Sequence, residues 1–131
     1  TVGRLLDAGF DWIDVAGAGG TSWAKVEIYS RGETPESSLY APFNGFGLPT
    51  ADALAQIRDA YPTANVIASG GIRDGVEIRK AELLGASLSG AALPFLAPAL
   101  ESSEAVCAVI DRFTAQYKAA RFVSSGLEKI G

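Results

Sequence analysis

The feature that most constrains this chain is a strand-like segment that ends abruptly in two glycines, at residues 65–75 (NVIASGGIRDG). The apolar run VIA stops before Gly70 and Gly71, and a pattern typical of a helix follows. Glycines at the end of a strand let backbone N–H groups approach an anion, and the next helix N-terminus adds its positive dipole end. Phosphate is therefore the candidate ligand, although a glycine pair after a strand is equally compatible with a plain tight turn.

Composition restricts the classes of function. With 131 residues, 48% hydrophobic content and a net charge of −4, residues 1–131 are expected to form one globular unit that buries a core. The mild acidity and the lack of a basic stripe argue against a nucleic-acid or membrane-surface partner. No stretch approaches the roughly 20 apolar residues of a membrane span. Without histidine, this chain alone cannot build a histidine base or a histidine-ligated metal site.

The single cysteine and the first residue support two further expectations. Cys107 falls in a helical pattern, where a small buried side chain is expected rather than a reactive thiol. One cysteine excludes an internal disulfide and fits a reducing cytoplasm. The chain has no methionine and starts at Thr1 inside a helical pattern, so we expect it to be a piece of a longer polypeptide.

Apolar periodicity predicts alternating helices and strands, with an irregular loop at residues 30–49. Thr50 is expected to cap one helix and Asp74 the next. The expected strands are residues 10–16, 65–69 and 88–92. The expected helices are residues 1–9, 24–29 (a short turn), 51–61, 75–84 and a longer one from residue 102. Their expected buried positions include Val76, Ile78, Ala81, Leu84, Val106, Val109, Ile110, Phe113 and Tyr117.

This order of elements indicates a parallel sheet covered by helices. Three βα units are too few to close an eight-stranded barrel, but they match the back part of one; a free-standing three-stranded α/β domain is the alternative. In such barrels the loops after the seventh and eighth strands often bind a phosphate. The two glycine-containing turns, at residues 69–71 and 90–92, have the small side chains that such a site requires.

Four segments resemble the type 2 isopentenyl-diphosphate isomerases, and together they extend over most of the chain. They are VAGAGGTSWAKVE (15–27), GLPTADAL (47–54), ASGGIRDG (68–75) and LLGASLSGAALPFL (83–96). The resemblance implies the C-terminal part, about strands six to eight, of a flavin-dependent TIM (β/α)₈ barrel. Its implied reaction interconverts isopentenyl and dimethylallyl diphosphates. One departure is Phe46, where the motif WGxPT of that family carries tryptophan.

The resemblance also implies positions that bind the cofactor FMN. They are Thr21 after the sixth strand, Gly70, Gly71 and Arg73 after the seventh, and the amides of Ala92 and Leu93 after the eighth. The family also requires Mg²⁺ and NADPH, and a homo-oligomer is implied at full length. Its magnesium-binding glutamate, its histidine, a flavin-contacting lysine and the glutamine beside the substrate's double bond belong to the earlier part of the barrel. We therefore expect no catalytic residue and no metal ligand in this chain.

Two alternatives remain at this level. Another FMN-dependent oxidoreductase with the same barrel is the first. Within that group, an IMP dehydrogenase-like enzyme needs a cysteine that GAGGTSW lacks, and 2-hydroxy-acid oxidases use a histidine absent here. The second alternative is a non-catalytic phosphate-binding fragment.

Overall fold

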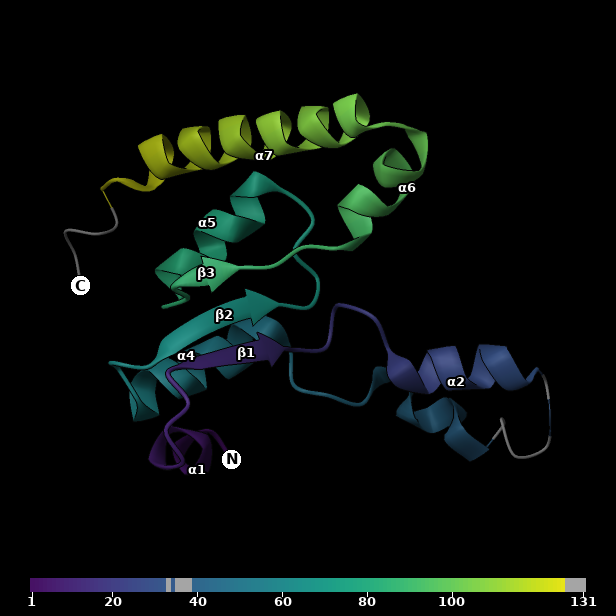
Figure 1. The fold of residues 1–131 in the computed structure, drawn as a ribbon. Helices are drawn as coiled ribbons and strands as arrows, with labels where there is room; N and C mark the ends of the chain where they lie inside the picture. Colours follow the sequence, from purple (N-terminus) through teal and green to yellow (C-terminus); the bar gives the residue numbers. More distant parts are fainter. Residues whose placement is uncertain (33, 35–38, 127–131) are drawn as a thin grey trace.

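The computed structural model describes residues 1–32, 34 and 39–126 (Figure 1). Its centre is a three-stranded parallel sheet in the order β1-β2-β3. The strands are β1 (Trp12–Ala16), β2 (Asn65–Ser69) and β3 (Leu88–Ser89). Because the strands are parallel, their C-terminal ends meet at one edge of the sheet, and the three loops that follow them start together there. The predicted α/β architecture is confirmed, and it is consistent with part of a barrel.

Helices cover one face of this sheet. The helical elements are α1 (Val2–Asp7), α2 (Trp23–Arg31), the 3₁₀ helix η1 (Ala41–Gly45), α4 (Thr50–Ala60), α5 (Gly75–Leu83), α6 (Leu93–Glu101) and α7 (Ser103–Ser124). The helix α4 packs on β1 and β2, α5 packs on β3, and α7 packs on α5 and α6. The core joins residues of α4, β2 and α5 in one cluster that includes Leu54, Ile57, Val66, Ala68 and Ala81.

The opposite face of the sheet is left open by the described residues. The register places Ile13 beside Val66 on the covered face, and Asp14 beside Ile67 on the other. On that open face Trp12 is 46% exposed and Leu88 is 55% exposed. A face that carries large apolar side chains without cover is typical of a surface meant to be buried.

Two elements near the C-terminal end differ from the prediction. The strand expected at residues 88–92 ends at Ser89, and the helix α6, which was not predicted, begins three residues beyond Gly90. Pro94 in the first turn of α6 lacks an N–H that the helix would use, so proline is well tolerated there. The apolar run LPFL therefore begins a helix directly after the predicted strand segment.

The helix caps follow the prediction in one case and contradict it in another. Asp74 caps α5 as expected: its side chain accepts the N–H of Glu77 at 2.8 Å. Thr50 does not cap α4. The cap position is Pro49, Thr50 is the first helical residue, and its hydroxyl bonds elsewhere.

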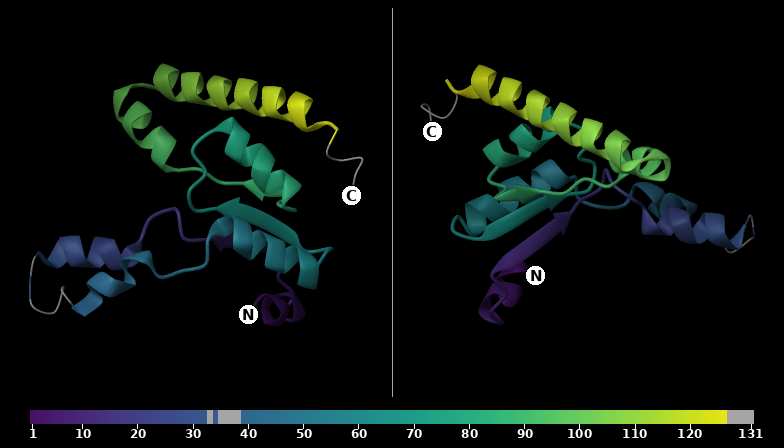
Figure 2. Two further views of the ribbon diagram at one scale, coloured as in Figure 1. Left: turned by 180° about the vertical axis from the view of Figure 1, so that it is seen from behind. Right: turned by 45° about the horizontal axis from the view of Figure 1, so that its top comes forward.

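An arm projects from the sheet, formed by α2 and η1 and visible at one side in Figures 1 and 2. The helix α2 is longer than the turn predicted, and Ser22 caps its start by accepting the N–H of Lys25. The loop predicted at residues 30–49 contains η1, whose Phe43 ring meets the Phe46 ring edge-on at 6.1 Å. Residues 33 and 35–38 of that loop lie outside the described part of the chain. Phe46, the departure from the family motif, is 84% exposed.

Some positions of α5 and α7 that were predicted to be buried are exposed. Val76 and Ile110 are exposed, and Cys107 is an exposed thiol, not a buried side chain. The reason is that α7 packs on α5 and α6 along the stripe of Val109 and Phe113, and Cys107 lies off that stripe. None of the described helices is both long enough and apolar enough to cross a membrane.

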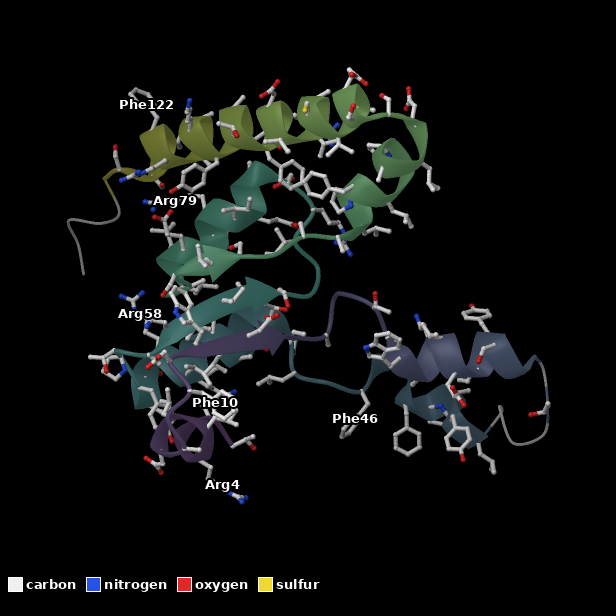
Figure 3. The ribbon with its side chains drawn as sticks, in the orientation of Figure 1. Arg4, Phe10, Phe46, Arg58, Arg79 and Phe122 are labelled. Atoms are coloured by element: carbon white, nitrogen blue, oxygen red, sulfur yellow. The ribbon has the colours of Figure 1, made fainter. Side chains whose placement is uncertain are left out.

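A polar cluster joins α5 to the C-terminal half of α7 (Figure 3). Buried Arg79 donates from Nε to the Ser124 hydroxyl and from Nη1 to the Glu82 carboxylate, each at 2.8 Å. The Tyr117 hydroxyl donates to the same carboxylate at 2.9 Å. Burial raises the pKa of Glu82, but hydrogen bonds from Arg79 and Tyr117 and the arginine charges outweigh it, so the pKa lies below its ordinary value. The charged carboxylate is therefore the form that joins the helices.

This cluster predicts a specific loss of stability in acid. A carboxylate with a lowered pKa stabilises the fold fully above its unfolded pKa of about 4.3, and that contribution is lost as the pH falls through the lower folded value. In Glu82→Gln, the free energy of unfolding is expected to change less between roughly pH 3 and pH 6 than it does in the unchanged protein. Urea unfolding between pH 3 and pH 6, roughly the range that these pKa values define, measures it. An unchanged slope in Glu82→Gln would contradict the assignment.

Candidate cofactor-binding site

The loops that follow the three strands converge at one edge of the sheet. Gly20 lies against Gly70 so closely that a Cβ added to Gly20 would come within 2.7 Å of the Gly70 Cα. Gly71 approaches the backbone of Gly19 in the same way. On the other side, the N–H of Gly90 donates to the Ala68 carbonyl at 2.8 Å. Gly20 and Gly71 can approach these backbones because they lack side chains, whereas a Cβ added to Gly90 would make only ordinary contact, 3.5 Å from the Ser69 Cβ.

The turn after β2 has a conformation reserved for glycine. Gly70 has a φ of 82° and Gly71 a φ of 101°, both in the left-handed region that disfavours residues with a Cβ. Two consecutive residues of this kind turn the chain sharply from β2 toward α5. The sequence-based reading of a glycine turn at the strand end is thus confirmed as a conformation, and its role with phosphate stays a prediction.

Arg73 supplies positive charge beside this turn. Its Nη2 donates to the Gly19 carbonyl at 3.4 Å, so the guanidinium reaches the first glycine loop. Its own backbone N–H is occupied, because it donates to the Glu77 carboxylate at 2.6 Å. Any contact that Arg73 makes with an anion would therefore come from its exposed guanidinium and not from its amide.

The remaining predicted positions lie on the two neighbouring loops. Thr21 is exposed and directly follows Gly20, which touches the glycine turn. Ala92 occupies the cap position of α6 and Leu93 is its first helical residue. No side chain caps α6, Pro94 has no N–H, and the Phe95 N–H donates to the Ala92 carbonyl at 3.0 Å, so the amides of Ala92 and Leu93 are the ones this helix end offers to a ligand. The structure thus places all six predicted residues on loops or helix ends that start from one edge.

One contact on the open face of the sheet was missed from sequence. The Ser69 hydroxyl donates to Asp14 Oδ1 at 2.7 Å, which links β1 to the residue just before the glycine turn. A carboxylate in the middle of an apolar strand is the signal that could have indicated a partner on a neighbouring strand.

The chemistry available at this edge is that of anion binding. It offers glycine amides, one guanidinium and a helix N-terminus, all of which suit a phosphate group. Within the described residues, no three histidine, cysteine, aspartate or glutamate side chains gather where they could hold a metal ion. A separate hollow of about 280 Å³ lies on the arm, lined by Lys25, Ile28, Tyr29, Gly32 and Asn44. It includes no residue of the glycine turns, so it is not part of this site.

Known proteins have sequences similar to that of this chain. The profile of the FMN-dependent dehydrogenase family matches residues 2–129. An isopentenyl-diphosphate delta-isomerase of Stutzerimonas stutzeri is 47% identical over 128 residues, which cover 98% of this chain and 37% of that protein. The isomerase of the same name from Deinococcus radiodurans is 45% identical over 124 residues, which cover 94% of this chain and 36% of that protein. The one from Methanococcus maripaludis is 41% identical over 120 residues, which cover 92% of this chain and 34% of that protein.

The resemblance found in the sequence motifs is therefore confirmed by whole-sequence similarity. The chain spans about a third of the length of these curated relatives. Nearly all of its residues lie within the match to the family profile. The chain belongs to the FMN-dependent dehydrogenase family.

Proposed function

We propose that this chain supplies the FMN-phosphate-binding part of an FMN-dependent isopentenyl-diphosphate delta-isomerase. The observation that carries the proposal is the convergence of three glycine-containing loops in a chain whose relatives bear that name. In this proposal β1, β2 and β3 are strands six to eight of a (β/α)₈ barrel, and residues 1–131 are its C-terminal portion. The enzyme would be homo-oligomeric, as the resemblance implies, and cytoplasmic, a location that the single cysteine fits.

Two structural features support the barrel assignment. The open face of the sheet carries Trp12, Ile67 and Leu88, which would face the barrel interior once the other strands are present. The helix α6 is a short additional helix after the last strand. Phosphate sites of such barrels often combine the loops after strands seven and eight with the N-terminus of a helix of this kind.

In this proposal the residues of the chain bind and orient the cofactor. The amides of Gly70 and Gly71 and the amides of Ala92 and Leu93 would hold the phosphate from two sides. The guanidinium of Arg73 would balance its charge, and Thr21 would contact FMN from the loop after β1. FMN in its reduced form would supply the proton transfer to and from the allylic system, with no net change in oxidation state.

The remaining groups belong to the part of the relatives that this chain does not span. Mg²⁺, which would neutralise the substrate diphosphate, has no proposed ligand among residues 1–131. NADPH would serve to reduce the flavin, and its site is likewise assigned to the rest of the protein. The proposed substrates are isopentenyl and dimethylallyl diphosphates.

The test uses the protein expressed from its complete reading frame. It is expected to purify with flavin, visible in its absorbance spectrum. After reduction and addition of Mg²⁺, it should convert isopentenyl diphosphate into dimethylallyl diphosphate. Proton NMR in D₂O follows both the conversion and the uptake of solvent deuterium. Protein that binds no flavin and converts no isopentenyl diphosphate would refute the proposal.

The second candidate is an FMN-dependent oxidoreductase, which the description of the family profile favours. It predicts net oxidation of a nicotinamide cofactor coupled to a substrate that is not a prenyl diphosphate. The two candidates share the FMN site, so they differ in one measurement. Stoichiometric consumption of NADPH during turnover supports the oxidoreductase, and conversion with only catalytic NADPH supports the isomerase.

A further inference from the structure

We infer that Thr50 is a positioning residue that sets the direction of the phosphate-binding amides in the turn after β2. The inference rests on the proposed function, because it assumes that Gly70 and Gly71 bind the FMN phosphate. Thr50 itself lies on α4, outside the loops to which FMN contacts were assigned.

The Thr50 hydroxyl contacts two successive carbonyls of the glycine turn. Its Oγ1 lies 3.0 Å from the Ser69 carbonyl oxygen and 2.7 Å from that of Gly70, and it donates to both. One hydroxyl proton is thus shared, with the shorter bond to Gly70. Because Thr50 is half-buried and comes from another element, this contact joins the start of α4 to the end of β2.

These two bonds determine where the amides point. The described chain has no cis peptide bond, and in a trans peptide the C=O and the following N–H point in opposite directions. The Ser69 and Gly70 carbonyls face Thr50, so the N–H groups of Gly70 and Gly71 both face away from it. These two N–H groups are the donors that the proposal assigns to the phosphate.

The neighbouring backbone keeps Thr50 in place. The Ala18 N–H donates to the Leu48 carbonyl at 2.8 Å, and Ala18 pairs with Pro49 in an isolated parallel bridge. Gly17 lies between Thr50 and Gly70. A Cβ added to Gly17 would come within 2.5 Å of Thr50 Oγ1, and a Cβ added to Gly70 would come within 2.5 Å of the Gly17 oxygen. The loop after β1 thus packs Thr50 against the turn.

The experiment compares FMN with riboflavin, which lacks the phosphate, in the protein expressed from its complete reading frame. Thr50→Val keeps the shape of the side chain and removes the hydroxyl, and Thr50→Ser keeps the hydroxyl. We expect Thr50→Val to weaken FMN binding about tenfold, the scale of one hydrogen bond, and to leave riboflavin binding within about twofold. Thr50→Ser should restore FMN binding. Titration of the apoprotein followed by flavin fluorescence gives both dissociation constants.

The outcomes separate this inference from the proposed function. An unchanged protein that binds FMN no more tightly than riboflavin has no phosphate site, which refutes the proposed site and the inference with it. If the unchanged protein prefers FMN, but Thr50→Val lowers the affinities for FMN and riboflavin equally or lowers neither, only the inference is overturned. Failure of Thr50→Ser to restore binding also overturns it, since the hydroxyl would then not be the group responsible. The ³¹P resonance of bound FMN gives a second readout, expected to shift in Thr50→Val alone.

Discussion

Gly70→Ala is expected to lower the affinity for FMN about 100-fold or more. Alanine at a φ of 82° is strained by roughly 1–2 kcal/mol. The new Cβ would also lie 2.5 Å from the Gly17 oxygen and 2.9 Å from the Gly17 nitrogen, where no flexible side chain can move aside. Overpacking of this kind costs about 1–3 kcal/mol, so the turn should open and lose the direction of its amides.

The measurement is FMN titration of the apoprotein together with a thermal unfolding curve. A matched control is Gly45→Ala on the arm, where an added Cβ meets no atom within 4 Å and φ lies outside the left-handed region. The control should bind FMN as the unchanged protein does. FMN affinity that stays within about twofold in Gly70→Ala would show that the turn does not shape the phosphate site.

The sequence was sufficient to predict the central part of this turn. The apolar strand at residues 65–69, the two glycines after it and the Asp74 cap of α5 appear where the pattern places them. Each is a local signal: a strand needs a short apolar run, a left-handed turn needs glycine, and a cap needs a short polar side chain. Local rules of this kind operate over a few residues, and a single sequence displays them.

Features that depend on distant partners could not be predicted in the same way. Thr50 after Pro49 has the local pattern of a helix cap, yet its hydroxyl bonds to carbonyls 19 and 20 residues away. Asp14 likewise pairs with Ser69, 55 residues further along the chain. Such contacts follow from the parallel pairing of β1 with β2, and neither strand sequence alone determines the register of that pairing.

The helix α6 shows a conflict between local rules. Its sequence, LPFLAPALE, is apolar up to Glu101 and has Pro98 inside, so periodicity and proline both argue against a helix. Packing on α7 decides in favour of the helix, with the Phe95 ring 5.5 Å from the Phe113 ring. The same packing explains why Phe113 is buried and Ile110, on the same predicted stripe, is half exposed.

The close approach of α5 and α7 predicts that Gly75→Ala lowers the free energy of unfolding by about 3 kcal/mol. Gly75 is the first residue of α5 and is buried. A Cβ there would overlap the Phe113 carbonyl oxygen and come within 2.5 Å of the Tyr117 nitrogen and 2.9 Å of the Gln116 Cβ. Two of these are backbone atoms of a regular helix, which cannot shift singly. The N–H of Gly75 also donates to Gln116 Oε1 at 3.2 Å, a bond that separation of the helices would break.

The sign of the change in unfolding free energy in Gly75→Ala shows whether packing or helix propensity has the larger effect at this position. Alanine is the better helix former, by up to about 1 kcal/mol in a helix interior, so propensity alone predicts that Gly75→Ala does not destabilise the protein. Gly126→Ala, where an added Cβ meets nothing within 4 Å, lacks the clash and should leave stability nearly unchanged. Urea unfolding of both variants in the protein expressed from its complete reading frame gives the comparison. A more stable Gly75→Ala protein would mean that α7 moves away from α5 at little cost, and that Arg79 and its partners alone join the two helices.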